Sequence, residues 1–183
     1  MKKVILFIFV LLISISSASE REDKLDQLFI KLKNLNSETI VEIEQQIWSL
    51  WSTHPSNQEL TKVLAQGSEL VLAQKYIEAS QIFTRVIEID PTWAEAWNKR
   101  ATVFYLLQNY EASQKDIDEV LKLEKRHFGA LAGQGLVNIK LKNYEKAIKS
   151  YRQALEIYPT MKSPRIMIEQ IEALIKFQLT LMF

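Results

Sequence analysis

Two histidines and no cysteine limit the chemistry open to this chain of 183 residues. His54 and His127 have no carboxylates at a spacing typical of metal ligands, and no Gly-x-Ser-x-Gly turn supplies a serine nucleophile. Gly129, Gly133 and Gly135 lie within a helical pattern rather than in a phosphate-binding loop. We therefore expect no catalytic residues, metal site or cofactor, and we expect both histidines to lie in loops or at helix ends.

The composition is that of one helix-rich globular domain, with 48% hydrophobic and 25% charged residues. Lysine and arginine total 23 against 22 acidic residues, so the chain lacks the positive field that nucleic-acid binding usually needs. The absence of cysteine excludes disulfides and thiolate metal sites. These features argue against a nucleic-acid partner and favour a packed helical protein.

The N-terminus has the three parts of a secretory signal peptide. Met1 and two lysines precede the apolar stretch Val4–Ile15, and small residues lead to Ala18. A helix over that stretch would span about 18 Å, short of a hydrocarbon core of about 30 Å. We expect residues 1–18 to be removed between Ala18 and Ser19, giving an exported protein, periplasmic or secreted. The alternative is an uncleaved anchor in the inner membrane.

Residues 19–55 predict a pair of amphipathic helices, because apolar residues recur at steps of three and four in two runs. The pair is interpreted as an N-terminal cap, with a degenerate repeat as the alternative. The runs are Leu25, Leu28, Phe29, Leu32 and Leu35, then Ile40, Ile43, Ile47, Leu50 and Trp51.

Residues 60–161 repeat themselves three times with a period of 34 residues, as segments 60–93, 94–127 and 128–161. Ser56 with Glu59, and Thr92 with Glu95, have the spacing of capping boxes before two of these segments. The equivalent residues are Gly67, Ala101 and Gly135 at position eight; Tyr76, Tyr110 and Tyr144 at seventeen; Ala79, Ser113 and Ala147 at twenty; and Phe83, Ile117 and Tyr151 at twenty-four.

This pattern predicts a helical hairpin in each segment. Small residues at positions eight and twenty let the two helices approach closely, and large residues fill the remaining space. Pro91 and Pro159 end the second helix of the first and third hairpins. A single hairpin leaves an apolar face uncovered, so we expect the three to stack.

A last amphipathic stretch, residues 163–183, predicts a C-terminal capping helix that begins at Ser163 and Pro164. Its end, from Phe177 to Phe183, is unusually apolar. We expect this end to pack along the last repeat; the alternative is contact with a partner or a membrane.

The spacing resembles the tetratricopeptide repeat. The resemblance covers 102 of 183 residues, and it implies an all-α, right-handed α-solenoid of three helix hairpins with helical caps. Arg100, Asn138 and Lys125 depart from the family pattern, which puts local packing in doubt. The segments 97–102 and 127–131 are also similar to short exported repeat proteins of alphaproteobacteria, a resemblance that defines no function.

The resemblance implies a concave groove lined by the first helix of each hairpin. The lysine and asparagine that grip the terminal carboxylate of heat-shock chaperones in some members are replaced here by Leu64 and Ser68, so that clamp is missing. The groove is instead mostly apolar, although the terminal helices could cover part of it. The candidate binding residues are Leu64, Ser68, Asn98, Thr102, Tyr105, Leu106, Leu136, Ile139 and Lys140.

Arg100 stands where leucine is usual and would face the interior of its hairpin, where an unpaired charge costs several kcal/mol. We expect it to pair with Asp116 or Asp118 of the next helix. The alternative is an edge contact between Arg100 and a carboxylate of the ligand.

These observations predict a binding scaffold rather than an enzyme: an exported adaptor that takes a protein or peptide partner in its groove. A self-assembling structural module is the alternative, and a membrane-tethered assembly factor would follow if the leader is retained. Membrane association is expected only in that last case.

Overall fold

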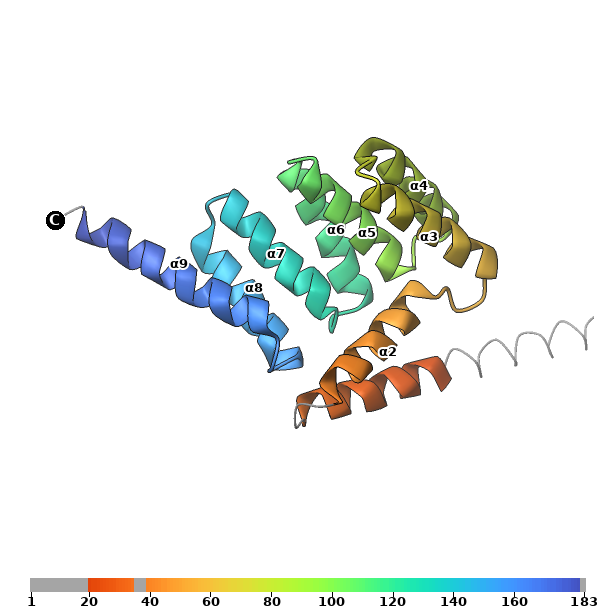
Figure 1. The fold of residues 1–183 in the computed structure, drawn as a ribbon, viewed down its shortest axis with the longest axis horizontal. Coiled ribbons are helices and arrows are strands. Elements are labelled where there is room, and N and C mark those ends of the chain that lie inside the picture. The colour runs from red at the N-terminus through yellow and green to blue at the C-terminus, as the bar shows by residue number, and fades with distance from the viewer. Residues whose placement is uncertain (1–19, 35–38, 182–183) are drawn as a thin grey trace, which may run out of the picture. The chain divides into compact units, whose positions relative to one another are not determined.

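The computed structural model describes residues 20–34 and 39–181, and every regular element within them is a helix (Figure 1). The chain divides into two compact units, Met1–Lys62 and Val63–Phe183. One helix spans residues 20–33. The others are α2 (Ile40–Ser52), α3 (Gln58–Leu72), α4 (Tyr76–Ile89), α5 (Ala94–Leu106), α6 (Tyr110–Leu123), α7 (Phe128–Lys140), α8 (Tyr144–Ile157) and α9 (Lys162–Thr180).

In the first unit, the helix over residues 20–33 packs against α2 through the apolar stripes that the sequence predicts. The rings of Phe29 and Trp51 lie with centroids 5.9 Å apart, and the Arg21 guanidinium donates to the Leu50 carbonyl. Leu35 lies outside the described residues. The buried stripe residues are Leu25, Leu28, Phe29, Leu32, Ile40, Ile43, Ile47 and Trp51.

The two predicted capping boxes are wrong. The Asn57 side chain, not Ser56, accepts from the backbone N–H groups of Glu59 and Leu60 at the start of α3. The N-cap of α5 is Trp93, which makes no side-chain capping bond, and Asp90 accepts from the backbone N–H of Thr92 in the turn before it. At α3, spacing alone could not separate the capping asparagine from the neighbouring serine, because both residue types cap helices well.

In the second unit, tight turns join the helices of each hairpin at equivalent residues. Gln74, Gln108 and Lys142 have φ near +60°, at 59°, 61° and 59°, and they stand 34 residues apart. After α5, the Gln108 and Asn109 N–H groups donate to the last-turn carbonyls of Tyr105 and Phe104. This left-handed residue ends the first helix of each hairpin and reverses the chain.

The helices of a hairpin approach closely at position eight, as predicted, and the residue met there is the large one at position twenty-four. Gly135 lies so close to Tyr151 that an added Cβ would be 2.5 Å from Cε1 and Cζ of the ring. Gly67 has the same relation to Phe83. In the middle hairpin, where the larger residue is an isoleucine, the small one is alanine. The size of one residue is thus matched to the size of the other within each hairpin.

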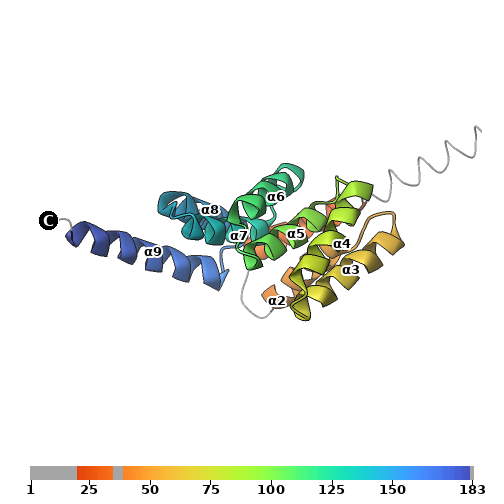
Figure 2. The ribbon, with the colours of Figure 1, turned by 90° about the horizontal axis from the view of Figure 1, so that it is seen from above.

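The last helix, α9, packs against α8 (Figure 2). It begins at Lys162 rather than at Ser163. Ile171 is buried against Tyr151, whereas Phe177 is 61% exposed. Leu179 and Leu181 are exposed too, so the expectation that this end packs along the last repeat is wrong for residues 177–181. Residues 182 and 183 lie outside the described part of the chain.

Candidate functional site

A small cavity of about 80 Å³ opens where α5 and α7 lie side by side in the repeat stack. It brings together Asn98, Thr102, Tyr105 and Leu136, four of the residues predicted to line a groove. Two glycines of α7, Gly129 and Gly133, line this space, and their lack of side chains leaves it open. Its remaining lining comes from Ala101, Ser113, Ile117 and Ala130.

The other predicted groove residues are more scattered. Leu106 is 40% exposed on α5 and Lys140 is exposed on α7, and neither lines the cavity. Ile139 is half-buried and packs against the cluster of Tyr151 and Ile171, so it belongs to the core under the last helix. Leu64 is 2% exposed and presents no surface to a ligand, which corrects its place in the predicted groove. Ser68 is half-buried, and its hydroxyl donates to the Leu64 carbonyl.

The polar atoms of the cavity mostly offer acceptors. The amide nitrogen of Asn98 donates to Glu95 Oε2 at 3.1 Å, which leaves Oδ1 without a hydrogen bond among the described residues. The Thr102 hydroxyl donates to the Asn98 carbonyl at 3.0 Å and can still accept. The Tyr105 ring rests against Tyr110, with centroids 5.6 Å apart. This set suits a ligand that offers N–H groups beside an apolar side chain.

Behind Asn98, Glu95 and His127 form a pair that the structure buries completely. Glu95 Oε2 lies 3.1 Å from His127 Nε2, and Lys99 Nζ lies 3.2 Å from the other carboxylate oxygen. His127 Nδ1 accepts from the backbone N–H of Ala130 at the start of α7, so the ring proton is on Nε2 and donates to Glu95. Glu95 thus has a hydrogen-bond partner on one carboxylate oxygen and a cation beside the other.

The sequence predicts His127 at a helix end, but it does not predict the contact between His127 and Glu95. His127 was predicted as an ordinary helix-end histidine; it does cap α7, yet it is fully buried. Glu95 was predicted in a capping box, but its carboxylate turns inward. The pair joins α5 to the start of α7 and fixes the Asn98 amide, so it supports the cavity from behind.

The charge of Glu95 makes this pair sensitive to acid. Burial raises the pKa of Glu95, but the hydrogen bond and electrostatic attraction of His127, together with the charge and hydrogen bond of Lys99, outweigh it and hold the pKa below its ordinary value of 4.5. The stability that the carboxylate contributes is therefore complete above pH 4.5 and is lost as the pH falls through the lower, folded-state pKa.

Glu95→Gln is expected to lower the free energy of unfolding at pH 7 by about 2 kcal/mol, because it removes a buried charged hydrogen bond. It is also expected to flatten the loss of stability between pH 5 and pH 3. Urea denaturation across that range measures both effects, with the exposed Glu145→Gln as control. An acid profile unchanged by Glu95→Gln would contradict the pairing.

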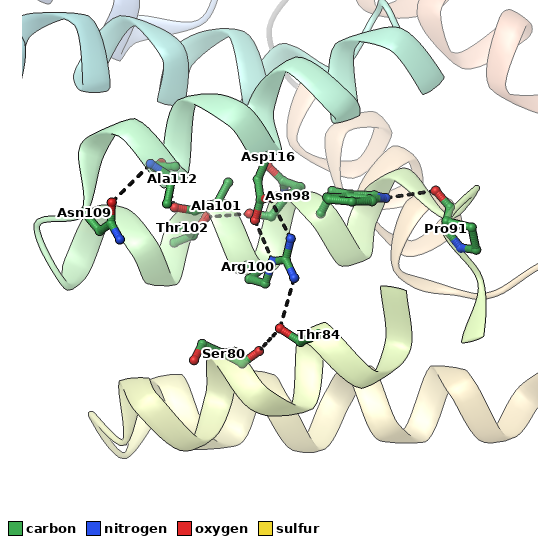
Figure 3. Close-up of polar contacts among 12 residues, drawn as sticks. Ser80, Thr84, Pro91, Asn98, Arg100, Ala101, Thr102, Asn109, Ala112 and Asp116 are labelled. Atoms are coloured by element: carbon green, nitrogen blue, oxygen red, sulfur yellow. Dashed lines mark hydrogen bonds and ion pairs between the residues drawn. The ribbon is translucent and has the colours of Figure 1, made fainter. Parts of the chain in front are cut away.

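Arg100 projects from α5 between Thr84 of α4 and Asp116 of α6 (Figure 3). Its Nε and Nη2 donate to the two carboxylate oxygens of Asp116 at 2.7 and 2.8 Å, and Nη1 donates to the Thr84 hydroxyl at 3.0 Å. The guanidinium also lies over the rings of Trp97 and Phe104, 5.0 and 5.4 Å from their centroids. Every part of the guanidinium is engaged inside the stack.

This arrangement decides between the two readings of Arg100. The expected pairing is present, and its partner is Asp116 rather than Asp118. Arg100 is thus not an edge contact for a ligand.

Within residues 20–34 and 39–181, no helix is both long and apolar enough to cross a membrane, and no cluster of three histidines or acids could hold a metal ion.

Comparison with known proteins gives the family. The sequence profile of the tetratricopeptide repeat matches residues 94–127 and 129–161. A TPR repeat-containing protein of Rhizobium etli is 31% identical over 161 residues, which span 87% of this chain and 76% of that protein. Hsp70-Hsp90 organizing protein 1 of Glycine max is 31% identical over 94 residues, or 51% of this chain and 16% of that much longer protein.

Solved structures agree with this on the fold. The first TPR of Spaghetti (RPAP3), bound to an HSP90 peptide, superposes with a TM-score of 0.63 at 21% identity, covering 65% of this chain and 94% of that one. An all-helical stack of hairpins with this period and these relatives leaves one assignment: the chain belongs to the tetratricopeptide repeat family.

Proposed function

We propose that this protein is an adaptor of the bacterial cell envelope that binds a protein or peptide segment in the cavity between α5 and α7. The observation that carries the proposal is the cavity itself, where Asn98, Thr102 and Tyr105 face the bare backbone of two glycines. The structural relative bound to an HSP90 peptide supports a peptide as the kind of ligand.

The size of the cavity favours a chain over a small molecule. Sites that enclose a small molecule usually measure about 300–1,000 Å³. A space of about 80 Å³ accepts one apolar side chain, and the rest of the ligand must lie along the surface beside it. Leu106 and Leu136, 40% and 37% exposed, offer apolar surface there. An amphipathic helix or an extended apolar peptide meets these requirements.

Filling the cavity tests the proposal. Gly133→Phe places a ring in the space, whereas Gly133→Ala adds only a methyl group, which would sit 3.8 Å from Ile117 in ordinary contact. In affinity capture from envelope extracts, we expect Gly133→Phe and the double variant Asn98→Ala with Tyr105→Ala to lose the partners that wild type and Gly133→Ala retain. Equal recovery by all four proteins would refute the assignment of the site.

Export is the second part of the proposal, and it rests on the leader in residues 1–18, which lie outside the described part of the chain. We expect the mature protein purified from the producing cell to begin at Ser19. Intact-mass spectrometry measures this directly. A chain that retains Met1 and fractionates with the inner membrane would instead indicate a tethered factor.

A further inference from the structure

The three positions that Thr84, Arg100 and Asp116 occupy recur one repeat later, where they hold different residues. Counting 34 residues on from Arg100, Asp116 and Thr84 gives Gln134, Ser150 and Asp118. Gln134 Oε1 accepts from the Ser150 hydroxyl at 2.9 Å, in place of the guanidinium–carboxylate pair. Arg100 lies over the aromatic ring of Phe104, and the equivalent position in the next repeat is Asn138.

These shorter side chains leave space. A cavity of about 570 Å³ lies among α6, α7 and α8, with Gln134, Asn138 and Ser150 in its lining. A cavity of this size falls in the range of about 300–1,000 Å³ that ligand sites occupy. On α7 its lining residues lie roughly 140° around the helix from Gly129, Gly133 and Leu136, at about 100° per residue, so it is separate from the groove cavity.

The lining of this cavity is polar, and two of its side-chain amides keep an atom available for a ligand. Asn138 is only 6% exposed; its amide nitrogen donates to the Gln134 carbonyl at 2.9 Å and to Gln114 Oε1 at 3.4 Å. Asn138 Oδ1 and Gln134 Nε2 make no hydrogen bond within the described chain. A buried amide with an unused acceptor, beside an amide with an unused donor, can pair with a ligand that carries both.

The charge at the rim is positive. Lys146 and Lys149, three residues apart on α8, line the cavity and are exposed, and neither forms an ion pair with a described residue. The one acid in the lining, Asp118, already accepts from the Gln114 amide at 2.8 Å. Two ammonium groups against one carboxylate leave an excess of one positive charge in the lining, which favours an anion at this rim.

We propose that the cavity among α6, α7 and α8 binds a carboxylate. The charged end meets Lys146 and Lys149, and the polar body of the ligand hydrogen-bonds with Gln134 and Asn138. The same chemistry is offered by a free polar carboxylic acid and by an acidic segment of a peptide. The site is independent of the peptide groove, because the two cavities share none of their lining residues.

The test is a titration of the ¹⁵N-labelled protein with four probes: citrate, N-acetylglutamate, a capped tetrapeptide containing two glutamates, and inorganic phosphate. Binding is expected to shift the side-chain amide signals of Gln134 and Asn138. A response to the free acids alone identifies a small-molecule site, and a response to the peptide alone identifies a partner segment. A response to none, or to inorganic phosphate alone, would overturn the proposal.

Two variants make the test specific. Lys146→Gln with Lys149→Gln is expected to weaken binding about tenfold, since each exposed ion pair contributes modestly. Gln134→Arg with Ser150→Asp rebuilds the pair of the preceding repeat, fills the cavity, and is expected to abolish binding while the melting temperature stays within a few degrees of wild type.

The matched control for charge is Lys115→Gln with Lys176→Gln, which removes two exposed lysines outside the cavity. Equal weakening by this control would reduce the effect to net charge and overturn the site. The groove variant Gly133→Phe is expected to leave carboxylate binding unchanged. Loss of carboxylate binding and failure of the groove proposal are therefore distinguishable.

Discussion

Replacing Gly135 with alanine is expected to lower the free energy of unfolding by about 2 kcal/mol, despite the higher helix propensity of alanine. The new Cβ would lie 2.5 Å from two ring atoms of Tyr151, a side chain that is 1% exposed and cannot move aside without disturbing the hairpin. In a chain of this size the melting temperature falls by about 4–8 °C. Thermal and urea denaturation measure the effect.

The middle hairpin supplies the compensating change. Ala101 there faces Ile117, so Gly135→Ala combined with Tyr151→Ile transplants a pair that the same fold already accommodates. We expect the double variant to be more stable than the sum of the two single changes by about 1 kcal/mol or more. Strict additivity would show that the two positions do not limit how closely α7 and α8 approach.

Arg100→Met is expected to cost about 3–5 kcal/mol of unfolding free energy, because it leaves the Asp116 carboxylate buried without its cation. Burial raises the pKa of Asp116 above its ordinary value, and the guanidinium offsets only part of that rise. With the cation removed, the carboxylate is expected to become still harder to ionise. The stability of the variant is therefore expected to decline further as the pH rises from 4 to 7.

The next repeat again offers the control. Arg100→Gln with Asp116→Ser copies the arrangement of Gln134 and Ser150, which contains no buried charge. It is expected to recover most of the stability lost in Arg100→Met. If Arg100→Met left the urea midpoint unchanged and weakened ligand binding instead, Arg100 would be a ligand contact after all.

Periodicity was enough to predict that a small residue at position eight lets the two helices of a hairpin approach closely, but the structure shows that position twenty-four is the residue it meets. A glycine stands where the partner residue is aromatic, and an alanine stands where it is isoleucine. Helical geometry also predicts which of the two aspartates pairs with Arg100. Asp116 shares the buried face of α6 with Ser113, Ile117 and Val120, whereas Asp118 does not.

The polar details were harder to predict from sequence. The contact between Glu95 and His127 depends on how α5 meets the start of the next repeat, and no local pattern encodes that distance. The cavity among α6, α7 and α8 has one signal in the sequence, because Asn138 departs from the repeat pattern. That departure indicates altered packing, but it does not predict that the space remains open and is lined by amides.

The central claim is that a partner chain occupies the cavity between α5 and α7, and site-specific photo-crosslinking in the producing cell tests it most directly. A photoreactive residue at Leu106, beside the cavity, is expected to trap a discrete protein adduct. The same residue at Lys122, exposed on α6, is expected to trap none. The adduct is expected to disappear when Gly133→Phe is added. An adduct that persists with the cavity filled, or that forms equally from Lys122, would contradict the account.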